Sequence, residues 1–308
     1  MDVRKMIREK KLSVFLSFLG LIRPFTLLAP FTVSLSIMIA SFFYHGGEFN
    51  YALLFQIILP ASISLSLLNG ASNALNQATD HKSDGISKPY RPIPQGKISV
   101  KNAYLFSFLL YCFSFFMAFM VHGTFFVFVL IITFFTVSYS VPPRLKDKLV
   151  LNQVWIAIPR GLLGILASWS VFGSVFHPLP LIIASISALF LFGGSITKDI
   201  TDCTADRECG TKTLVNNYGV RKAACVSFPF MFFPFLLIPL AINFGFLKPI
   251  FWFLTFLAIP GIYIFKLMVD KQMPSKFFEN TQAWSLMYLT YFIFASSFSV
   301  ATILSILV

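Results

Sequence analysis

The segment NQATDHKSD places an asparagine and two aspartates at intervals of four residues, at Asn76, Asp80 and Asp84. On an α-helix, residues four apart are rotated by only about 40° around the axis, so these oxygen-bearing side chains are expected to share one face. Carboxylate and amide oxygens gathered in this way can bind a hard metal cation. A single pair of acids at this spacing is, however, commonly no more than the solvated end of a helix.

A second acidic segment, KDITDCTAD, carries Asp199, Asp202 and Asp206. It aligns with the first without gaps at an offset of 122 residues, so that Asp202 matches Asp80 and Asp206 matches Asp84. A solvated surface does not require the same spacing to recur, and the repeat therefore favours a site. Oxygen ligands without soft donors suit Mg²⁺, which proteins usually hold by one or two carboxylates while water and substrate phosphate complete its shell.

The charge of such a site indicates a polyanionic ligand. Five carboxylates with two Mg²⁺ would leave roughly one negative charge, and a diphosphate would add about three more, so basic side chains are needed around it. The candidates are Arg23, Arg91, Arg144, Lys146, Arg160 and Lys198. Arg160 lies about ten residues inside an apolar stretch. An ionisable group at that depth usually faces a bundle interior or a water-filled cavity, although snorkelling to the membrane edge is an alternative.

Histidine and cysteine offer no competing metal site. The four cysteines form no CxxC pair, and the five residues between Cys203 and Cys209 fit no zinc pattern. Three of the four histidines, His45, His122 and His177, fall in loops expected on the opposite side of the membrane from the aspartates.

The elements that must position these residues are membrane-spanning helices. Hydrophobic residues make up 57% of the chain and charged residues 12%, with a mean hydropathy of +0.79, which excludes an ordinary soluble domain. Apolar windows long enough to cross about 30 Å of hydrocarbon recur along the chain. The nine windows are 24–44, 51–75, 102–121, 124–141, 151–173, 178–198, 222–243, 247–269 and 283–307. We therefore predict an all-α integral membrane protein, a single domain over residues 1–308 with about nine transmembrane helices and two aspartate-rich cytoplasmic motifs.

Basic residues predict the orientation of these helices, because Lys and Arg concentrate on the cytoplasmic side of short loops. With nine crossings, 23 of the 24 basic residues fall on one side, including Lys266, Lys271 and Lys276 near the last turn, and only Lys248 falls on the other. The N-terminus and both acidic segments are therefore expected to be cytoplasmic, in the cell membrane, with the C-terminus opposite. Contact with anionic lipid accounts for the net charge of +12, and no nucleic-acid partner is expected.

Together, the motifs resemble the UbiA superfamily of intramembrane prenyltransferases. The segment NQATDHKSDGISKPYRPIPQG is similar to the first family signature, NDxxDxxxD with an RPxPxG-like tail, and KDITDCTADRECGTKTL is similar to the second, DxxDxxxDRxxGxxTL. YSVPPRLK resembles the tyrosine-and-lysine segment between the fourth and fifth spans, and IRPFTLLAP resembles the start of the first span. The likeness covers almost the whole chain in order, and nine spans with a cytoplasmic site is the family architecture.

The resemblance implies transfer of a prenyl group from an isoprenyl diphosphate to an acceptor, with release of pyrophosphate. It implies that two Mg²⁺ ions are bound by Asn76, Asp80, Asp84, Asp199, Asp202 and Asp206. It implies that diphosphate oxygens are bound by Arg23, Arg91, Lys146 and Lys198, to which the charge argument adds Arg144 and Arg160. Tyr139 would shield the allylic cation or position the acceptor. Stabilising the departing pyrophosphate is expected to be the largest catalytic contribution, while the prenyl chain stays in the bilayer.

One residue departs from the family pattern. The usual acid after the asparagine is Gln77 in this chain, whereas the second segment keeps an acid at the matching position, Asp199. An amide can coordinate a cation but supplies less charge. The sequence therefore leaves the contribution of Gln77 to Mg²⁺ binding open, and Gln77→Asp tests it.

The acceptor also stays open. Members of the family prenylate hydroxybenzoate, dihydroxynaphthoate, homogentisate, chlorophyllide, haem and glycerol-phosphate lipids. The segments YSVPPRLK and KDITDCTADRECGTKTL look closer to the chlorophyll-synthase and archaeal-lipid branches than to the hydroxybenzoate branch. We expect an aromatic acceptor, which would be a quinone or tetrapyrrole precursor, or a lipid acceptor, with prenylation of a glycerol-phosphate lipid as the alternative.

Two non-enzymatic interpretations compete with prenyl transfer. Transporters hold their ions near the bilayer midplane, commonly within inverted repeats, whereas the two acidic segments here each follow an even-numbered span at the cytoplasmic margin. That placement argues against transport. A lipid-binding protein without activity has only Gln77 in its favour.

Overall fold

Long helices make up most of the chain in the computed structural model, which describes residues 3–48, 50–270 and 280–307, and side chains from residue 12 onward. Lys271 and Lys276 lie outside the described residues. Among the described residues, eight helices are long and apolar enough to cross a membrane. Five of these regions consist mainly of one helix: α2 (Pro24–Tyr44), α6 (Val100–Val121), α7 (Gly123–Ser140), α13 (Val220–Asn243) and α15 (Gln282–Leu307).

Three crossings consist of consecutive helical pieces. The second joins α3 (Tyr51–Leu53), η1 (Leu54–Ile58) and α4 (Leu59–Thr79). The sixth joins α10 (Pro178–Gly194), η4 (Ser195–Lys198) and α11 (Asp199–Glu208), and the eighth joins η5 (Pro249–Leu257) and α14 (Ala258–Val269). Outside the crossings lie the 20-residue helix α1 (Val3–Ile22) and three short elements, α5 (His81–Ser87), η2 (Leu145–Asp147) and α12 (Leu214–Tyr218).

The predicted fifth crossing, 151–173, is an interrupted helix. It runs through α8 (Leu151–Ala157), the π-helical turn η3 (Ile158–Leu163) and α9 (Gly164–Trp169). Pro159 opens the wide turn, since proline has no amide hydrogen to donate to the preceding turn of helix. The all-α membrane fold is thus confirmed, with eight long apolar crossings among the described residues and a further one, 151–169, that is interrupted by the π turn.

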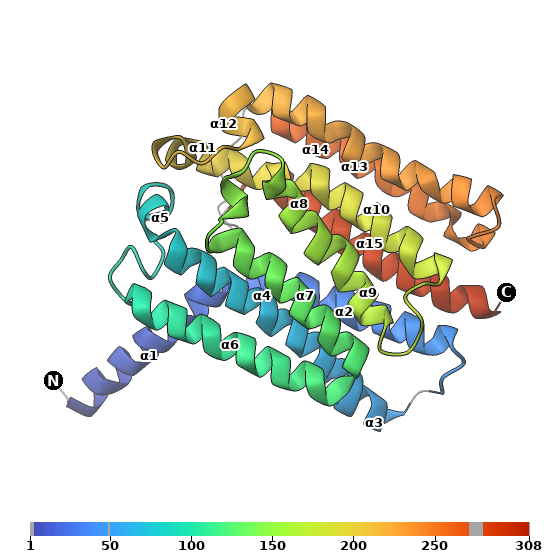
Figure 1. Cartoon of the computed structure of the whole chain (residues 1–308), viewed down its shortest axis with the longest axis horizontal. Helices are drawn as coiled ribbons and strands as arrows, with labels where there is room; N and C mark the ends of the chain where they lie inside the picture. The colour runs from blue at the N-terminus through green and yellow to red at the C-terminus, as the bar shows by residue number, and fades with distance from the viewer. Residues whose placement is uncertain (1–2, 49, 271–279, 308) are drawn as a thin grey trace.

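Consecutive crossings pack side by side, and the last packs against the first. α2 contacts α4, α4 contacts α6, α6 contacts α7, and the series continues through η3, α10, α13 and α14 to α15, which returns to α2. The ends of the chain lie at opposite ends of the long axis, as an odd number of crossings requires (Figure 1). α5, which follows the second crossing, contacts α11, the last part of the sixth, at the end of the bundle near the N-terminus (Figure 1).

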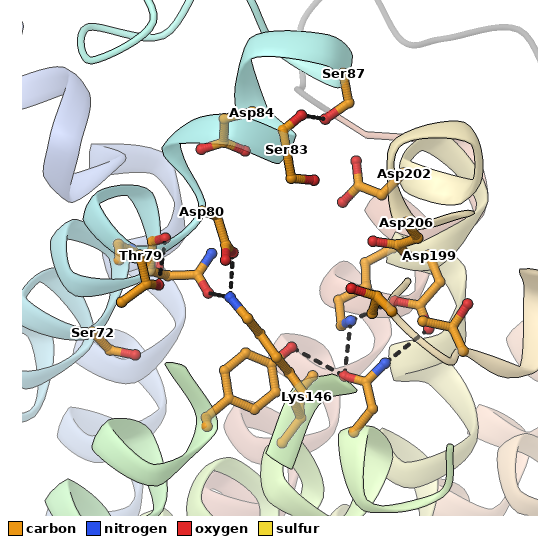
Figure 2. A pocket seen from close by; sticks show the side chains of 18 of the residues that line it. Ser72, Thr79, Asp80, Ser83, Asp84, Ser87, Lys146, Asp199, Asp202 and Asp206 are labelled. Atoms are coloured by element: carbon orange, nitrogen blue, oxygen red, sulfur yellow. Dashed lines mark hydrogen bonds and ion pairs between the residues drawn. The ribbon is translucent and has the colours of Figure 1, made fainter. Parts of the chain in front are cut away.

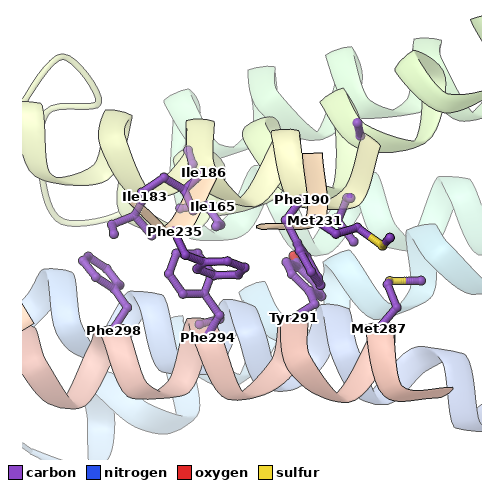
Figure 3. Packing of buried hydrophobic residues seen from close by; sticks show 14 of the residues in the cluster. Ile165, Ile183, Ile186, Phe190, Met231, Phe235, Met287, Tyr291, Phe294 and Phe298 are labelled. Atoms are coloured by element: carbon purple, nitrogen blue, oxygen red, sulfur yellow. The ribbon is translucent and has the colours of Figure 1, made fainter. Parts of the chain in front are cut away.

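A buried aromatic cluster fastens the second half of the bundle. Met287, Tyr291, Phe294 and Phe298 recur every three or four residues on α15, so they share one face, which points toward α10 in Figure 3. The Phe294 ring lies edge-on to Phe235 of α13 with centroids 5.3 Å apart. Such close packing holds membrane helices together, because lipid offers no hydrophobic driving force between them.

Small polar residues let α4 and α6 approach closely. The Ser64 hydroxyl donates to the Ser114 carbonyl at 2.9 Å, and the Ser114 hydroxyl donates to the Ser64 carbonyl at 2.8 Å. About two turns farther along, the Ser107 hydroxyl donates to the carbonyl of Ala71 at 2.7 Å. Small residues of this kind are typical of tight contacts between membrane helices, and they fix the helix that ends in the first acidic segment.

Candidate active site

The first acidic segment crosses the junction between α4 and α5. α4 ends at Thr79, and Asp80 leads into α5 with φ −101° and ψ 12°. The amide of Asp80 still donates to the Asn76 carbonyl at 2.9 Å, and the amide of Asp84 donates to the Asp80 carbonyl at 2.8 Å. The four-residue register expected from the sequence therefore continues through the break between the two helices.

Asp80 is held by two basic residues from the loop after α7. Its carboxylate contacts the Lys146 ammonium and accepts a hydrogen bond from Arg144 Nη2 at 3.1 Å. Lys146 Nζ also donates to Asn76 Oδ1 at 2.9 Å, and Ser140 Oγ donates to the same oxygen at 3.2 Å. Burial lowers the pKa of Lys146, although the charge of Asp80 opposes this shift. The YSVPPRLK segment thus folds onto the first acidic segment.

Asp84 and Arg91 form a buried ion pair. Arg91 Nη1 donates to both carboxylate oxygens of Asp84, at 2.7 and 2.9 Å, and each residue is only 4% exposed. Burial raises the pKa of Asp84, while the charges of Arg91 and Lys88 act against the increase. Arg91, the arginine of the RPIPQG tail of the first signature, therefore reaches the first acidic segment, and its Nη1 is bound to Asp84.

The second acidic segment faces the first from α11 (Figure 2). Asp199 is 2% exposed, contacts the Lys198 ammonium and accepts a hydrogen bond from Asn152 Nδ2 at 3.0 Å. The carboxylate of Asp206 has no hydrogen bond or ion pair with any residue that the structure describes, but it lies within electrostatic range of Lys198, Asp199 and Asp202. A carboxylate in this position is available to a cation.

Two contacts join the two halves of the site. The Lys88 ammonium, which follows the first acidic segment, contacts the carboxylate of Asp202. Asp147 accepts hydrogen bonds from Arg144 Nε at 2.8 Å and from Thr211 Oγ1 at 3.2 Å, so it ties the loop after α7 to the loop after α11. Neither Lys88 nor Asp147 was predicted as a site residue. Lys88 lies within the quoted first signature, whereas nothing in the sequence pairs Asp147 with Thr211.

A polar pocket of about 520 Å³ lies between the two acidic segments. Every site residue proposed from the sequence lines it: Arg23, Asn76, Asp80, Asp84, Arg91, Tyr139, Arg144, Lys146, Arg160, Lys198, Asp199, Asp202 and Asp206. The two segments, 122 residues apart in sequence, therefore lie around one space.

Asn152 of α8 is a further pocket residue that the sequence gave no reason to select. Its Oδ1 accepts hydrogen bonds from Tyr139 OH at 3.0 Å and from Lys198 Nζ at 3.1 Å, while its amide nitrogen donates to Asp199. The Lys146 ammonium lies 5.9 Å from the centre of the Tyr139 ring, within range of a cation–π contact. Asn152 thus orients the tyrosine and the second acidic segment together.

Arg23 and Arg160 also line the pocket. Arg23 joins α1 to α2 with a left-handed backbone, φ 53°, and its carbonyl accepts a hydrogen bond from the Thr26 amide at 2.8 Å. Arg160, on η3, donates from Nη2 to Asn69 Oδ1 at 3.2 Å. Neither of these hydrogen bonds involves a carboxylate of the acidic segments.

Gln77 points away from the pocket. Its Nε2 donates to the carbonyls of Leu21 at 2.8 Å and Gly20 at 3.2 Å, and the residue is 1% exposed. These carbonyls belong to the last turn of α1, where backbone acceptors need partners outside the helix. The amide considered from the sequence as a cation ligand is instead a C-terminal cap for α1, and Gln77 is not among the described residues that line the pocket.

The donors around the pocket fit Mg²⁺ as two separate half-sites. Among the described residues, no three His, Cys, Asp or Glu side chains lie close enough together to hold one metal ion alone. Mg²⁺ usually takes only one or two carboxylates and completes its shell with water and substrate phosphate. Carboxylates on opposite walls of one pocket, such as Asp80 and Asp206, match that preference when a diphosphate lies between them.

Residues 33–287 match the sequence profile of the UbiA prenyltransferase family. A relative, digeranylgeranylglyceryl phosphate synthase of Methanosphaera stadtmanae, is 28% identical over 213 residues, which are 68% of this chain and 72% of the relative.

Two solved structures share the fold. A UbiA homolog from Archaeoglobus fulgidus bound to GPP and Mg²⁺ superposes with a TM-score of 0.71 at 20% identity, covering 95% of this chain and 100% of that chain. A structure of digeranylgeranylglyceryl phosphate synthase in membranes superposes with a TM-score of 0.65 at 20% identity, covering 94% of this chain and 98% of that one.

Proposed function

Because the chain belongs to the UbiA prenyltransferase family, we propose that it transfers a geranylgeranyl group from geranylgeranyl diphosphate to the hydroxyl of a glycerol-phosphate lipid. The observation that carries this proposal is the meeting of two acidic segments and their basic partners around one pocket (Figure 2). A diphosphate with bound cations is the kind of ligand that such a surface of mixed charge can hold.

The choice of acceptor rests on the relatives. Digeranylgeranylglyceryl phosphate carries two geranylgeranyl groups on one glyceryl phosphate, so its last prenyl transfer requires an acceptor that already carries one. The similarity of this chain to a synthase of that compound supports a lipid acceptor, which the sequence left as the alternative, over an aromatic one.

In the proposed reaction, the bond between the prenyl carbon and the diphosphate oxygen breaks, and a bond from that carbon to the acceptor hydroxyl oxygen forms. The hydroxyl proton leaves toward the aqueous end of the pocket, and pyrophosphate is released. Mg²⁺ held by Asn76 and the five aspartates would supply charge that stabilises the departing pyrophosphate. Lys146 and Arg144, which contact Asp80, are positioned to bind diphosphate oxygens beside it.

The pocket continues into an apolar cavity of about 90 Å³ toward the membrane interior. Apolar residues lining this cavity include Val33, Leu65, Leu68, Leu191 and Met287. Such a lining suits the part of a polyisoprenyl chain nearest the diphosphate, which can lie in this apolar environment while the polar head reaches the aspartates.

We also propose that the N-terminus and the pocket lie on the cytoplasmic side of the membrane, which the distribution of the basic residues supports. Lys248 is the one basic residue predicted on the other side of the membrane. Its ammonium donates a hydrogen bond to the carbonyl of Ser305, close to the C-terminal end of α15. The packing of α15 against α2 supports one domain over residues 1–308.

The test is Mg²⁺-dependent release of pyrophosphate by purified protein given geranylgeranyl diphosphate and geranylgeranylglyceryl phosphate. We expect release to require both substrates and to fall at least about 100-fold in Asp80→Ala and Asp202→Ala, since each removes charge from the leaving-group site. Asp270→Ala is the matched control, because Asp270 ends α14 and does not line the pocket. Wild-type protein that stays folded and releases no pyrophosphate contradicts the proposal.

A further inference from the structure

The deep wall of the pocket carries a cation that the aspartates do not neutralise. Arg160 is exposed to the pocket from η3, and the carbonyl of the same residue accepts a hydrogen bond from Tyr291 OH at 2.9 Å. In the described chain its guanidinium forms no ion pair, and its hydrogen-bond partner, Asn69, is a neutral amide. A charged group inside a membrane span is energetically expensive unless it meets water or an opposite charge.

The sequence suggested Arg160 as a ligand of the diphosphate, but Arg160 lies deeper in the membrane than the proposed diphosphate site. Asn69 precedes Asn76 by seven residues on α4, which corresponds to about 10 Å along the helix axis. On the facing wall, Arg160 follows Asn152 by eight residues, which corresponds to about 12 Å of helix below the contact of Asn152 with the second acidic segment. Two independent helices thus place the Arg160–Asn69 pair about two turns below the groups that contact the aspartates.

Packing fixes the guanidinium in this direction. Gly161, the next residue on η3, lies so close to α10 that a Cβ there would come within 2.5 Å of the Ala188 Cα. The helix cannot rotate about its axis without losing this contact. A π-helical turn is also uncommon and frequently marks a functional site, and here it carries the charged residue.

Arg160 lies where the polar pocket meets the apolar cavity, because it lines both. Tyr288 and Trp284 line both spaces as well, and Tyr288 lies within electrostatic range of Arg160. A ligand that fits this junction has an anionic group near the arginine and an apolar chain beside it.

We propose that Arg160, oriented by Asn69, binds the phosphate of the acceptor lipid and thereby selects a phosphorylated acceptor. The inference rests on the proposed function and names a specificity-determining residue for it. The donor diphosphate and the acceptor phosphate repel each other, so one pocket that binds both needs a separate cation for each. With the diphosphate at the aspartates and the phosphate at Arg160, the acceptor hydroxyl lies between them, where the prenyl carbon is exposed to attack.

The experiment compares kcat/KM for geranylgeranylglyceryl phosphate with kcat/KM for the same lipid without its phosphate. Charge-assisted hydrogen bonds of this kind change binding by about 10- to 100-fold, so we expect Arg160→Gln to reduce the preference for the phosphorylated acceptor by that factor. The KM for geranylgeranyl diphosphate should stay within about twofold of wild type. Arg160→Lys keeps the charge and should retain part of the preference.

Arg144→Gln is the matched comparison, because it removes a cation from the aspartate end of the same pocket. It should raise the KM for geranylgeranyl diphosphate and leave the phosphate preference unchanged. If Arg160→Gln cannot be recovered folded, Asn69→Ala leaves the arginine in place and should reduce the preference to a smaller extent. An unchanged preference in the folded Arg160→Gln protein, or in Asn69→Ala where that variant replaces it, overturns the inference while leaving prenyl transfer intact. A wild-type protein that makes no prenylated lipid refutes the proposed function instead.

Discussion

The ammonium of Lys88 contacts the carboxylate of Asp202, although the two residues are 114 positions apart in the chain. Lys88 follows α5 and Asp202 lies on α11, so this ion pair links the two acidic segments directly. Lys88 is 7% exposed, which places the contact in the wall of the site rather than on its rim. The two halves of the chain are therefore coupled at the point where a diphosphate is proposed to bind.

The first prediction concerns this ion pair. Lys88→Met should lower kcat/KM for geranylgeranyl diphosphate by about 10- to 100-fold, since it leaves Asp202 without its cation and removes a candidate phosphate ligand. Lys88→Arg should retain most of the activity. Steady-state kinetics at saturating acceptor measures the effect. Lys97→Met, in the exposed loop before α6, is the control, and equal rates in the two Met variants would show that the ion pair has no role.

The second prediction concerns Gln77. Gln77→Asp should lower the free energy of unfolding by about 1–3 kcal/mol, because the shorter acid cannot donate to the Leu21 and Gly20 carbonyls and is buried among them. The Mg²⁺ concentration for half-maximal activity should not change. Thermal unfolding in detergent and a Mg²⁺ titration check the two parts. A variant of wild-type stability that needs less Mg²⁺ would show that this position does act on the metal.

The third prediction concerns metal binding. Chelation with EDTA should abolish transfer, and added Mg²⁺ should restore it. Asp206→Asn should raise the Mg²⁺ concentration needed for half-maximal activity about tenfold or more, because it removes a full ligand charge from a carboxylate that no described side chain neutralises. Glu208→Gln, two residues away on the same helix and exposed, is the matched control. Identical titrations of the two variants would argue against Asp206 as a ligand.

The fourth prediction concerns Asp147 as a positioning residue. Asp147→Ala removes the carboxylate that accepts from both Arg144 and Thr211, so the loop after α7 loses its side-chain tie to the loop after α11 and keeps the backbone hydrogen bond from the Lys212 amide to the residue-147 carbonyl, 3.2 Å long. We expect the KM for geranylgeranyl diphosphate to rise roughly 3- to 10-fold with little change in kcat, as the loss of one or two hydrogen bonds at a binding site would give. A fall in kcat at unchanged KM would point to a role in the chemical step.

The sequence was sufficient for the features that depend on local pattern. Hydropathy located the crossings, and the repeated spacing of Asp80 with Asp84 and of Asp202 with Asp206 identified the residues that now line one pocket. Each of these features can be recognised within one segment of about twenty residues, or by aligning two such segments with each other.

Partners between segments were not predictable, because they depend on how each helix is rotated against its neighbours. The contact of Lys88 with Asp202 and the three hydrogen bonds of Asn152 are of this kind. Gln77 is a further residue whose partners could not be predicted from the sequence. It lies next to Asn76 in a ligand motif, but a rotation of about 100° per residue turns its side chain toward α1 instead of the pocket.

The most direct test of the central claim is mass spectrometry of the products formed by the purified protein in lipid vesicles with Mg²⁺ and geranylgeranyl diphosphate. The acceptors are supplied as a mixture of geranylgeranylglyceryl phosphate and aromatic acids such as hydroxybenzoate. We predict that the glyceryl phosphate gains one geranylgeranyl group, that pyrophosphate appears in equal amount, and that Asp202→Ala forms neither product. A prenylated aromatic acid in place of the lipid, or a lipid product that forms equally well in Asp202→Ala, would contradict the account.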